Sequence, residues 1–225
     1  MSILISKTIY LKLIVFFIII FLFLFLPSGS WFGFWEAWIY FIVFFAPTLI
    51  ITAYFMKRDP ELMERRSKAE EKEKNQKIFQ TISGSLFFIG LLMIPSLDYR
   101  FNWSNVPTYI VLLSNFIVLL GFLIVFFVFK ENTYTSAIIE VAENQKVITT
   151  GPYKLVRHPM YSGAVLVILF TPLALGSWWG LIPAIFITIF VIFRLLDEEK
   201  VLLKELQGYD VYCQKTRYHL IPFIW

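Results

Sequence analysis

Long apolar runs alternate with polar segments along this chain. The runs cover residues 9–26, 35–56, 78–95, 106–129, 160–175 and 178–196. Runs of about 18 or more apolar residues are long enough to cross a bilayer as helices. The pattern therefore predicts an all-α integral membrane protein with about six membrane helices. Only Gly176 and Ser177 separate the last two runs, which predicts a tight helical hairpin whose first arm is short for a full crossing.

The polar segments carry predictions of their own. Charges of alternating sign in residues 57–77 favour a solvated helix on the membrane surface, and a direct role in binding substrate is the alternative. Residues 138–148 predict a short strand, a turn and a second strand. Residues 96–105 follow a proline and predict a loop at headgroup depth, in which Asp98 and Arg100 are solvated.

Composition excludes an ordinary soluble domain, because 58% of the residues are hydrophobic and 19% are aromatic. Of the 20 Lys and Arg residues, 19 lie in segments that six crossings place on one face of the membrane, and Arg100 lies on the other. The positive-inside rule assigns the basic face to the cytoplasm. We therefore expect a multi-pass protein whose polar C-terminal segments are cytoplasmic.

The simplest division is one membrane domain, residues 1–225, with N-terminal helices in 1–129 and the site in 130–225. The first run has a signal peptide as its alternative interpretation. It is longer than the usual apolar region of a signal peptide, and no A-x-A-like cleavage site follows it. We therefore expect a retained helix.

Several classes of site are excluded by residue counts. A single cysteine, Cys213, excludes an internal disulfide and a multi-cysteine metal site. With only two histidines, His158 and His219, we expect no metal site. No glycine-rich phosphate-binding fingerprint occurs, so a nucleotide-like cofactor would need a site of another kind.

The stretch GPYKLVRHPMY, residues 151–161, combines charged, aromatic and proline residues between two apolar runs. Pro159 disfavours helical geometry at His158 and can itself begin the next helix. Arg157 and His158 are therefore expected at the mouth of a membrane helix, where free backbone N–H groups favour anions.

A second charged group ends the last apolar run. Arg194 and Glu198 are four residues apart and share a helix face. Arg194 lies at the hydrocarbon boundary, where an ionisable residue suggests a functional site. The alternative is an arginine that extends to the headgroups beside a solvated acidic cap. Because the 151–161 stretch reaches the same membrane face, we favour a shared site.

A zwitterion with a positive centre would suit such a site. The helix mouth with His158 can hold a carboxylate, and Glu198 or Glu199 can hold an ammonium or ribose hydroxyls. Aromatic side chains can face a cation or an adenine ring. S-adenosylmethionine combines these features, although the residues alone also allow a lipid headgroup.

Four motifs carry a family resemblance: DPELMERR (59–66), GPYKLVRHPMYSG (151–163), LALGSWW (173–179) and the acidic and aromatic tail of residues 194–222. In these motifs the chain resembles the isoprenylcysteine carboxyl methyltransferase family and its bacterial relatives, which are similar to phospholipid N-methyltransferases. One departure is the ending His219-Leu-Ile-Pro-Phe223, where many relatives have a basic residue and a glycine.

The resemblance implies a membrane methyltransferase that uses S-adenosylmethionine and acts on a lipid-like or prenylated small substrate, with carboxyl O-methylation as one form. It also implies a bacterial inner membrane location and a cytoplasmic pocket covered by a helical tail. Arg194 and Glu198 would be catalytic. The expected cofactor-binding residues are Tyr153, Arg157, His158, Pro159, Tyr161, Glu198, Glu199, Tyr209 and Tyr212.

Two other functions stay open at this point. One is a nicotinamide-dependent reductase of lipid or sterol double bonds, and the other is a non-enzymatic lipid-binding or transport protein. The acceptor atom and any general base are not indicated by the residues. As partners we expect the bilayer and an amphipathic small molecule, with no nucleic acid and no obligate protein partner.

Overall fold

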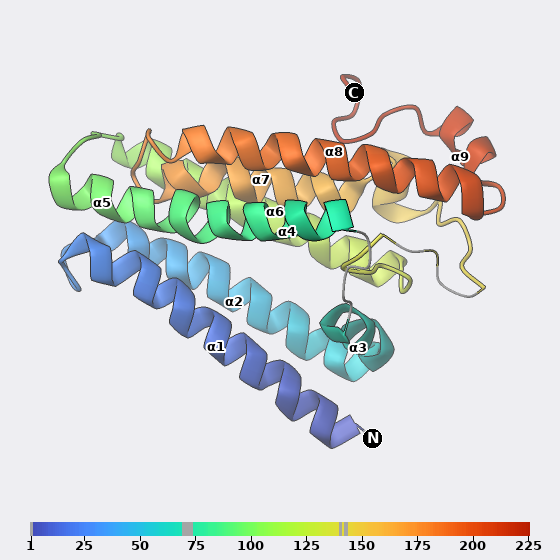
Figure 1. Cartoon of the computed structure of the whole chain (residues 1–225), viewed down its shortest axis with the longest axis horizontal. Coiled ribbons are helices and arrows are strands. Elements are labelled where there is room, and N and C mark those ends of the chain that lie inside the picture. The colour runs from blue at the N-terminus through green and yellow to red at the C-terminus, as the bar shows by residue number, and fades with distance from the viewer. Residues whose placement is uncertain (1, 69–73, 140, 142–143) are drawn as a thin grey trace.

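A computed structural model describes residues 2–68, 74–139, 141 and 144–225. Its described residues form a bundle of helices without a strand, as predicted (Figure 1). The prediction of two strands in residues 138–148 is wrong for the described part of that segment. Those residues form neither a strand nor a helix. The helices are α1 (Ser2–Ser28), α2 (Trp35–Arg58), α3 (Pro60–Lys68), α4 (Lys74–Ser85), the π-helix η1 (Leu86–Met93), α5 (Ile94–Phe101), α6 (Thr108–Glu131), the 3-10 helix η2 (Gly151–Lys154), α7 (Pro159–Ala174), α8 (Leu181–Glu205) and α9 (Tyr209–Lys215).

Four of the described helical stretches are long and apolar enough to cross a membrane, in agreement with the first four predicted runs. They are Lys7–Ser28, Trp35–Arg58, Gln80–Phe101 and Thr108–Glu131. The fifth run forms α7, an apolar helix of 16 residues. A turn over residues 175–180 connects α7 to α8, which packs against it.

The third apolar helix runs past the point where a loop was predicted. The predicted apolar run ended at Pro95 and a loop was expected after it, but α5 continues to Phe101. Proline interrupts a regular α-helix because its ring meets the carbonyl four residues earlier. Here the wide turns of η1 immediately precede Pro95, and such π-helical turns alter the regular hydrogen-bond ladder. The chain can therefore stay helical through the proline.

Asp98, which was predicted to be solvated, is buried within this extension. Its carboxylate accepts hydrogen bonds from the Ser104 backbone N–H at 2.7 Å, from the Ser104 hydroxyl at 2.6 Å and from the Ser177 hydroxyl. Ser177 belongs to the turn between α7 and α8. Asp98 thus connects three segments, and α5, to which it belongs, lies at the end of the bundle opposite α3 and α9 (Figure 1).

Helices α6 and α7 pack unusually closely, and this contact fixes the start of α7. A Cβ atom added at Gly163 would lie 2.7 Å from the carbonyl oxygen of Gly121. A Cβ atom added at Gly121 would likewise lie 2.7 Å from the carbonyl oxygen of Gly163. Small residues allow such close approach between membrane helices. The 151–161 stretch, which leads into α7, is therefore held directly against the C-terminal half of α6.

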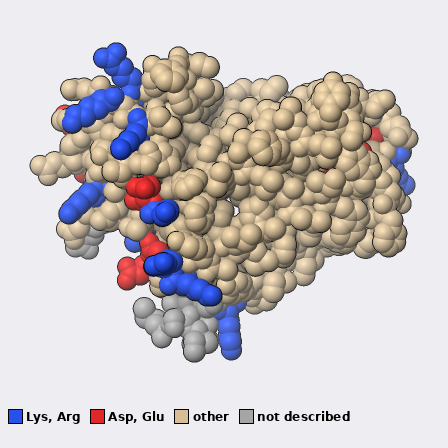
Figure 2. Space-filling view, turned by 180° about the vertical axis from the view of Figure 1, so that it is seen from behind, with Lys and Arg blue, Asp and Glu red and all other residues tan. Residues whose placement is uncertain are grey.

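The charged residues gather at one end of the bundle. Figure 1 shows α3 and α9 at the same end, together with the N-terminus. Lys and Arg side chains cluster at that end in the space-filling view, and the middle of the visible face is uncharged (Figure 2). This distribution agrees with the asymmetry of Lys and Arg along the sequence.

Candidate functional site

The approach to α7 has the local geometry that its prolines predict. His158 has the non-helical angles φ −124° and ψ 61°, and α7 begins at Pro159. The carbonyl of His158 accepts the N–H of Ser162 at 3.1 Å, so the residue caps the helix through its backbone. Both features follow from the steric effect of a proline on the residue before it.

The end of the chain lies along this stretch. The N–H groups of Arg157 and His158 donate to the carbonyls of Tyr218 and His219 at 2.8 and 3.0 Å. The Ser162 hydroxyl donates to the carbonyl of Leu220 at 2.6 Å. Three hydrogen bonds thus hold residues 218–220 against the mouth of α7.

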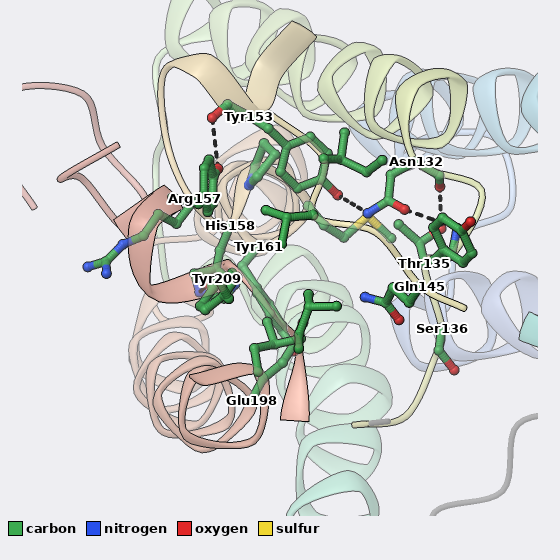
Figure 3. Close-up of a pocket in the computed structure, with 18 of the residues that line it drawn as sticks. Asn132, Thr135, Ser136, Gln145, Tyr153, Arg157, His158, Tyr161, Glu198 and Tyr209 are labelled. Atoms are coloured by element: carbon green, nitrogen blue, oxygen red, sulfur yellow. Dashed lines mark hydrogen bonds between the residues drawn. The ribbon is translucent and has the colours of Figure 1, made fainter. Parts of the chain in front are cut away.

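A cavity of about 290 Å³ lies beside this junction. Its walls come from the segment after α6, from η2 and the start of α7, from the second half of α8 and from the tail (Figure 3). Of the residues predicted for the site, those that line it are Tyr153, Arg157, His158, Pro159, Tyr161, Arg194, Glu198, Tyr209 and Tyr212. The cavity therefore brings together predicted residues as far apart in the chain as Tyr153 and Tyr212.

Tyr161 and Glu198 form a short polar contact within the cavity. The tyrosine hydroxyl donates to Glu198 Oε2 at 2.5 Å. Arg194, one turn earlier on α8, interacts electrostatically with both and donates to the Ala137 carbonyl at 2.9 Å. A hydroxyl, a carboxylate and a guanidinium are thus adjacent, a set that can bind both charged ends of a zwitterion.

His158 is buried and neutral. Its Nε2 lies 3.3 Å from the Tyr209 hydroxyl. Burial, together with smaller effects of the positive charge of Arg157 and of His219, lowers the pKa of its imidazole to about 3. The ring can exchange a hydrogen bond with a ligand or with Tyr209, but at neutral pH it supplies no positive charge.

Arg157, Glu199 and His219 form a second charged cluster next to the cavity, which we call the tail clasp. Arg157 Nη1 lies 2.6 Å from Glu199 Oε1, and His219 Nε2 lies 2.9 Å from Glu199 Oε2. The His219 ring also stacks on Trp225. Glu199 is buried and does not line the cavity, so its carboxylate is directed to the clasp.

Tyrosines make up much of the cavity wall on the tail side. The Tyr212 hydroxyl donates to the Tyr153 carbonyl at 2.8 Å, and Asn132 Nδ2 donates to the Tyr153 hydroxyl at 2.9 Å. Burial raises the pKa of Tyr153 to about 12 and raises the pKa of Tyr209 above its ordinary value. These tyrosines are therefore neutral, and they line the cavity, where a ring can contact an aromatic or cationic group.

Sequence reasoning missed two parts of the wall. One is the polar segment after α6, which contributes Asn132, Thr135, Ser136 and Gln145 (Figure 3). The other is Arg66 of α3. The signal for Arg66 was present in the motif DPELMERR, but charges of alternating sign there favoured a solvated helix over a role in binding substrate.

Comparison with known proteins agrees with this location. Residues 109–209 match the family model of the phospholipid methyltransferases, and this segment runs from α6 to the first residue of α9. A search of curated proteins gave no match. The matched segment contains most of the cavity wall. Over residues 109–209 the chain is therefore similar to the phospholipid methyltransferases, a group of membrane methyltransferases that resembles the isoprenylcysteine carboxyl methyltransferases.

Proposed function

We propose that the protein transfers a methyl group from S-adenosylmethionine to a lipid-like or prenylated acceptor in the cavity. The observation that carries this proposal is the meeting of Tyr161, Arg194 and Glu198 in one cavity, within the segment that matches a methyltransferase family. Carboxyl O-methylation is the form that a guanidinium beside the cavity favours most, because it can hold a carboxylate.

The donor set of the cavity suits this cofactor. Glu198 would bind the ammonium group or the ribose hydroxyls. The rings of Tyr153, Tyr209 and Tyr212 would face the adenine or the sulfonium cation. The volume of about 290 Å³ lies near the lower limit of about 300–1,000 Å³ for small-molecule sites. His158 and Pro159 complete the wall at the mouth of α7.

The chain's own contribution to the reaction is positioning. The cofactor supplies an activated methyl group, so the protein needs no covalent intermediate. Arg194 would orient the acceptor, and Tyr161 would hold the Glu198 carboxylate in place. Orientation alone can contribute roughly 7–11 kcal/mol in favourable cases. Exclusion of water when the cofactor and the acceptor fill the cavity would also favour a step in which opposite charges neutralise each other.

The proposal includes a topology. We propose that α7 and α8 form a hairpin that brings the crossings to six, and that α3, α9 and the cavity face the cytoplasm of a bacterial inner membrane. A 16-residue helix is about 24 Å long, less than the roughly 30 Å hydrocarbon core, so α7 would depend on its neighbours to complete a crossing.

Methyl transfer can be tested with purified protein in lipid nanodiscs, a total lipid extract and S-adenosylmethionine with a radioactive methyl group. We expect label in the organic phase with the wild-type protein and with Lys200→Gln, a control on the same helix whose ammonium is exposed. Glu198→Gln and Arg194→Gln should each lower the rate by at least about 100-fold. Normal rates in both variants would overturn the assignment of this cavity.

A binding measurement separates the proposal from the reductase alternative. Calorimetry should detect S-adenosylhomocysteine but not a reduced nicotinamide nucleotide. Binding of the nicotinamide alone would contradict the proposal.

A further inference from the structure

Arg66 is directed towards the cavity by the way α3 begins. α2 ends at Arg58, and the Asp59 carboxylate accepts the N–H of Leu62 at 3.0 Å, an N-cap interaction that starts α3. Leu62 is fully buried against Phe55 and its neighbours. Residues four apart share a helix face, so the burial of Leu62 turns Arg66 towards the bundle as well.

The guanidinium of Arg66 is held in place by uncharged groups. Its Nη1 donates to the Ser136 carbonyl at 3.0 Å, and its Cζ lies 4.7 Å from the centre of the Phe129 ring. In the part of the chain that the structure describes, no carboxylate pairs with it. Burial lowers its pKa to about 10, so the group stays charged at neutral pH.

Such a placement is unfavourable without an anion. A partly buried charge loses solvation, and a counter-ion or several hydrogen bonds must compensate for that loss. The Ser136 carbonyl occupies one of the five N–H donors of the guanidinium. The other donors form no further hydrogen bond with the described residues, and they are available to a planar oxyanion.

The charges of the cavity wall have the same implication. Four described residues of the wall are cationic at neutral pH, and one, Glu198, is acidic. Arg157 is neutralised by Glu199 in the tail clasp. Among the described residues of the wall, cations therefore still outnumber the single carboxylate, and this suits a ligand that brings at least one oxyanion in addition to the cofactor's own carboxylate.

We infer that Arg66 binds the oxyanion, a carboxylate or a phosphate, of the methyl acceptor. This inference rests on the proposed function. Arg66 enters from α3, on the side of the N-terminal helices, whereas α9 lies on the other side of the bundle end (Figure 1). Because α3 directly follows a membrane helix, Arg66 sits at the depth expected for a lipid headgroup. It is a specificity residue contributed by a part of the chain outside the 109–209 family match.

The test compares Arg66→Gln with Arg65→Gln. Arg65 is the matched control, because its Nη1 likewise donates to a carbonyl of the same segment, that of Thr133 at 2.6 Å, but the residue does not line the cavity. The proteins are placed in neutral phosphatidylcholine nanodiscs with hexadecanoate, hexadecyl phosphate or hexadecanol, and bound amphiphile is measured by native mass spectrometry. Calorimetry with S-adenosylhomocysteine is the second measurement.

Wild type and Arg65→Gln should bind the two anions at least about 10-fold more tightly than the alcohol. This ratio corresponds to the free energy of one charge-assisted hydrogen bond. Arg66→Gln should lose that preference and keep its affinity for S-adenosylhomocysteine. Arg66→Lys, which keeps the charge without the planar fork, should retain part of the preference, so the comparison also works if the glutamine variant is poorly folded.

Three results would overturn the inference. One is an unchanged anion preference in both Arg66 variants. The second is loss of S-adenosylhomocysteine binding with the anion preference intact, which would assign Arg66 to the cofactor's carboxylate. The third is an equal loss of preference in Arg65→Gln. Failure of the wild-type protein to bind S-adenosylhomocysteine would instead count against the proposed function, and the amphiphile measurements would still decide the role of Arg66.

Discussion

Removing the carboxylate of the tail clasp should release the C-terminal segment while the membrane bundle stays folded. Glu199 contacts Arg157 at 2.6 Å and His219 at 2.9 Å, and the side chains of Arg157 and Glu199 are only 11% and 9% exposed. In Glu199→Ala the Arg157 guanidinium loses its counter-ion while it remains largely buried. We therefore expect the tail, which carries His219, to separate more often from the mouth of α7.

The size of the effect on tail opening follows from the burial of the Arg157–Glu199 ion pair. Removing one partner of a buried ion pair costs about 3–5 kcal/mol. The tail keeps the three hydrogen bonds described above and the contact of Arg157 Nη2 with the His219 ring, worth about 0.5–1.5 kcal/mol each, so it is weakened but not free. A loss of 3 kcal/mol raises the population of the open tail by on the order of 100-fold. Glu199→Gln keeps an acceptor for Arg157 and should fall between Glu199→Ala and the wild type.

Limited trypsin digestion measures this population. Lys215 and Arg217 are exposed cleavage sites in the tail, and digestion follows the open population when opening and closing are fast. Glu205→Ala is the control, because Glu205 is exposed on the same helix. Cleavage of Glu199→Ala at the rate of the control, within about twofold, would refute the claim that the clasp holds the tail.

Two further predictions concern stability. The neutral His158 ring has a pKa of about 3 in the folded protein and about 6.5 when unfolded, so the unfolded chain takes up the proton first. Its stabilising contribution is present above pH 6.5 and lost towards pH 3, and thermal unfolding between pH 6.5 and about 4.5 should show a loss of about 3 kcal/mol that His158→Gln lacks. Gly163→Ala places a Cβ 2.7 Å from the Gly121 carbonyl oxygen and should lower stability by about 1–3 kcal/mol, whereas Gly84→Ala, with no atom within 4 Å, should not. Equal melting temperatures of Gly163→Ala and Gly84→Ala would show that α6 and α7 can move apart without a loss of stability.

The sequence predicted best where neighbouring residues alone determine the structure. The first four apolar runs became long helices because length and hydropathy are sufficient to specify them. His158 took non-helical angles because a proline follows it directly. Pro95 shows the limit of such rules, since the π-helical turns before it allow the helix to continue and no local signal announces them.

Features that depend on distant contacts were not predictable in the same way. Asp98 is buried because serines at 104 and 177 reach it, and the second of these is 79 residues away. Glu199 looked like a partner of Glu198 at the cofactor site, since the two are adjacent in sequence. Consecutive residues of a helix point in different directions, however, and only Glu198 lines the cavity. Glu199 meets the tail, whose path no periodicity describes.

The two charged groups at the mouth of α7 differ in a way that bears on how the site works. The tail clasp pairs its carboxylate with Arg157 and His219, so it is complete without a ligand and can hold the tail at rest. Arg66 lines the cavity with a carbonyl and an aromatic ring as its described partners, so an anion that enters the cavity would supply it with a counter-ion. Ligand binding should therefore stabilise α3 more than the tail. Hydrogen exchange of α3 should slow when an anionic amphiphile is added and stay unchanged with the neutral alcohol, while exchange of residues 218–220 should be the same in both cases.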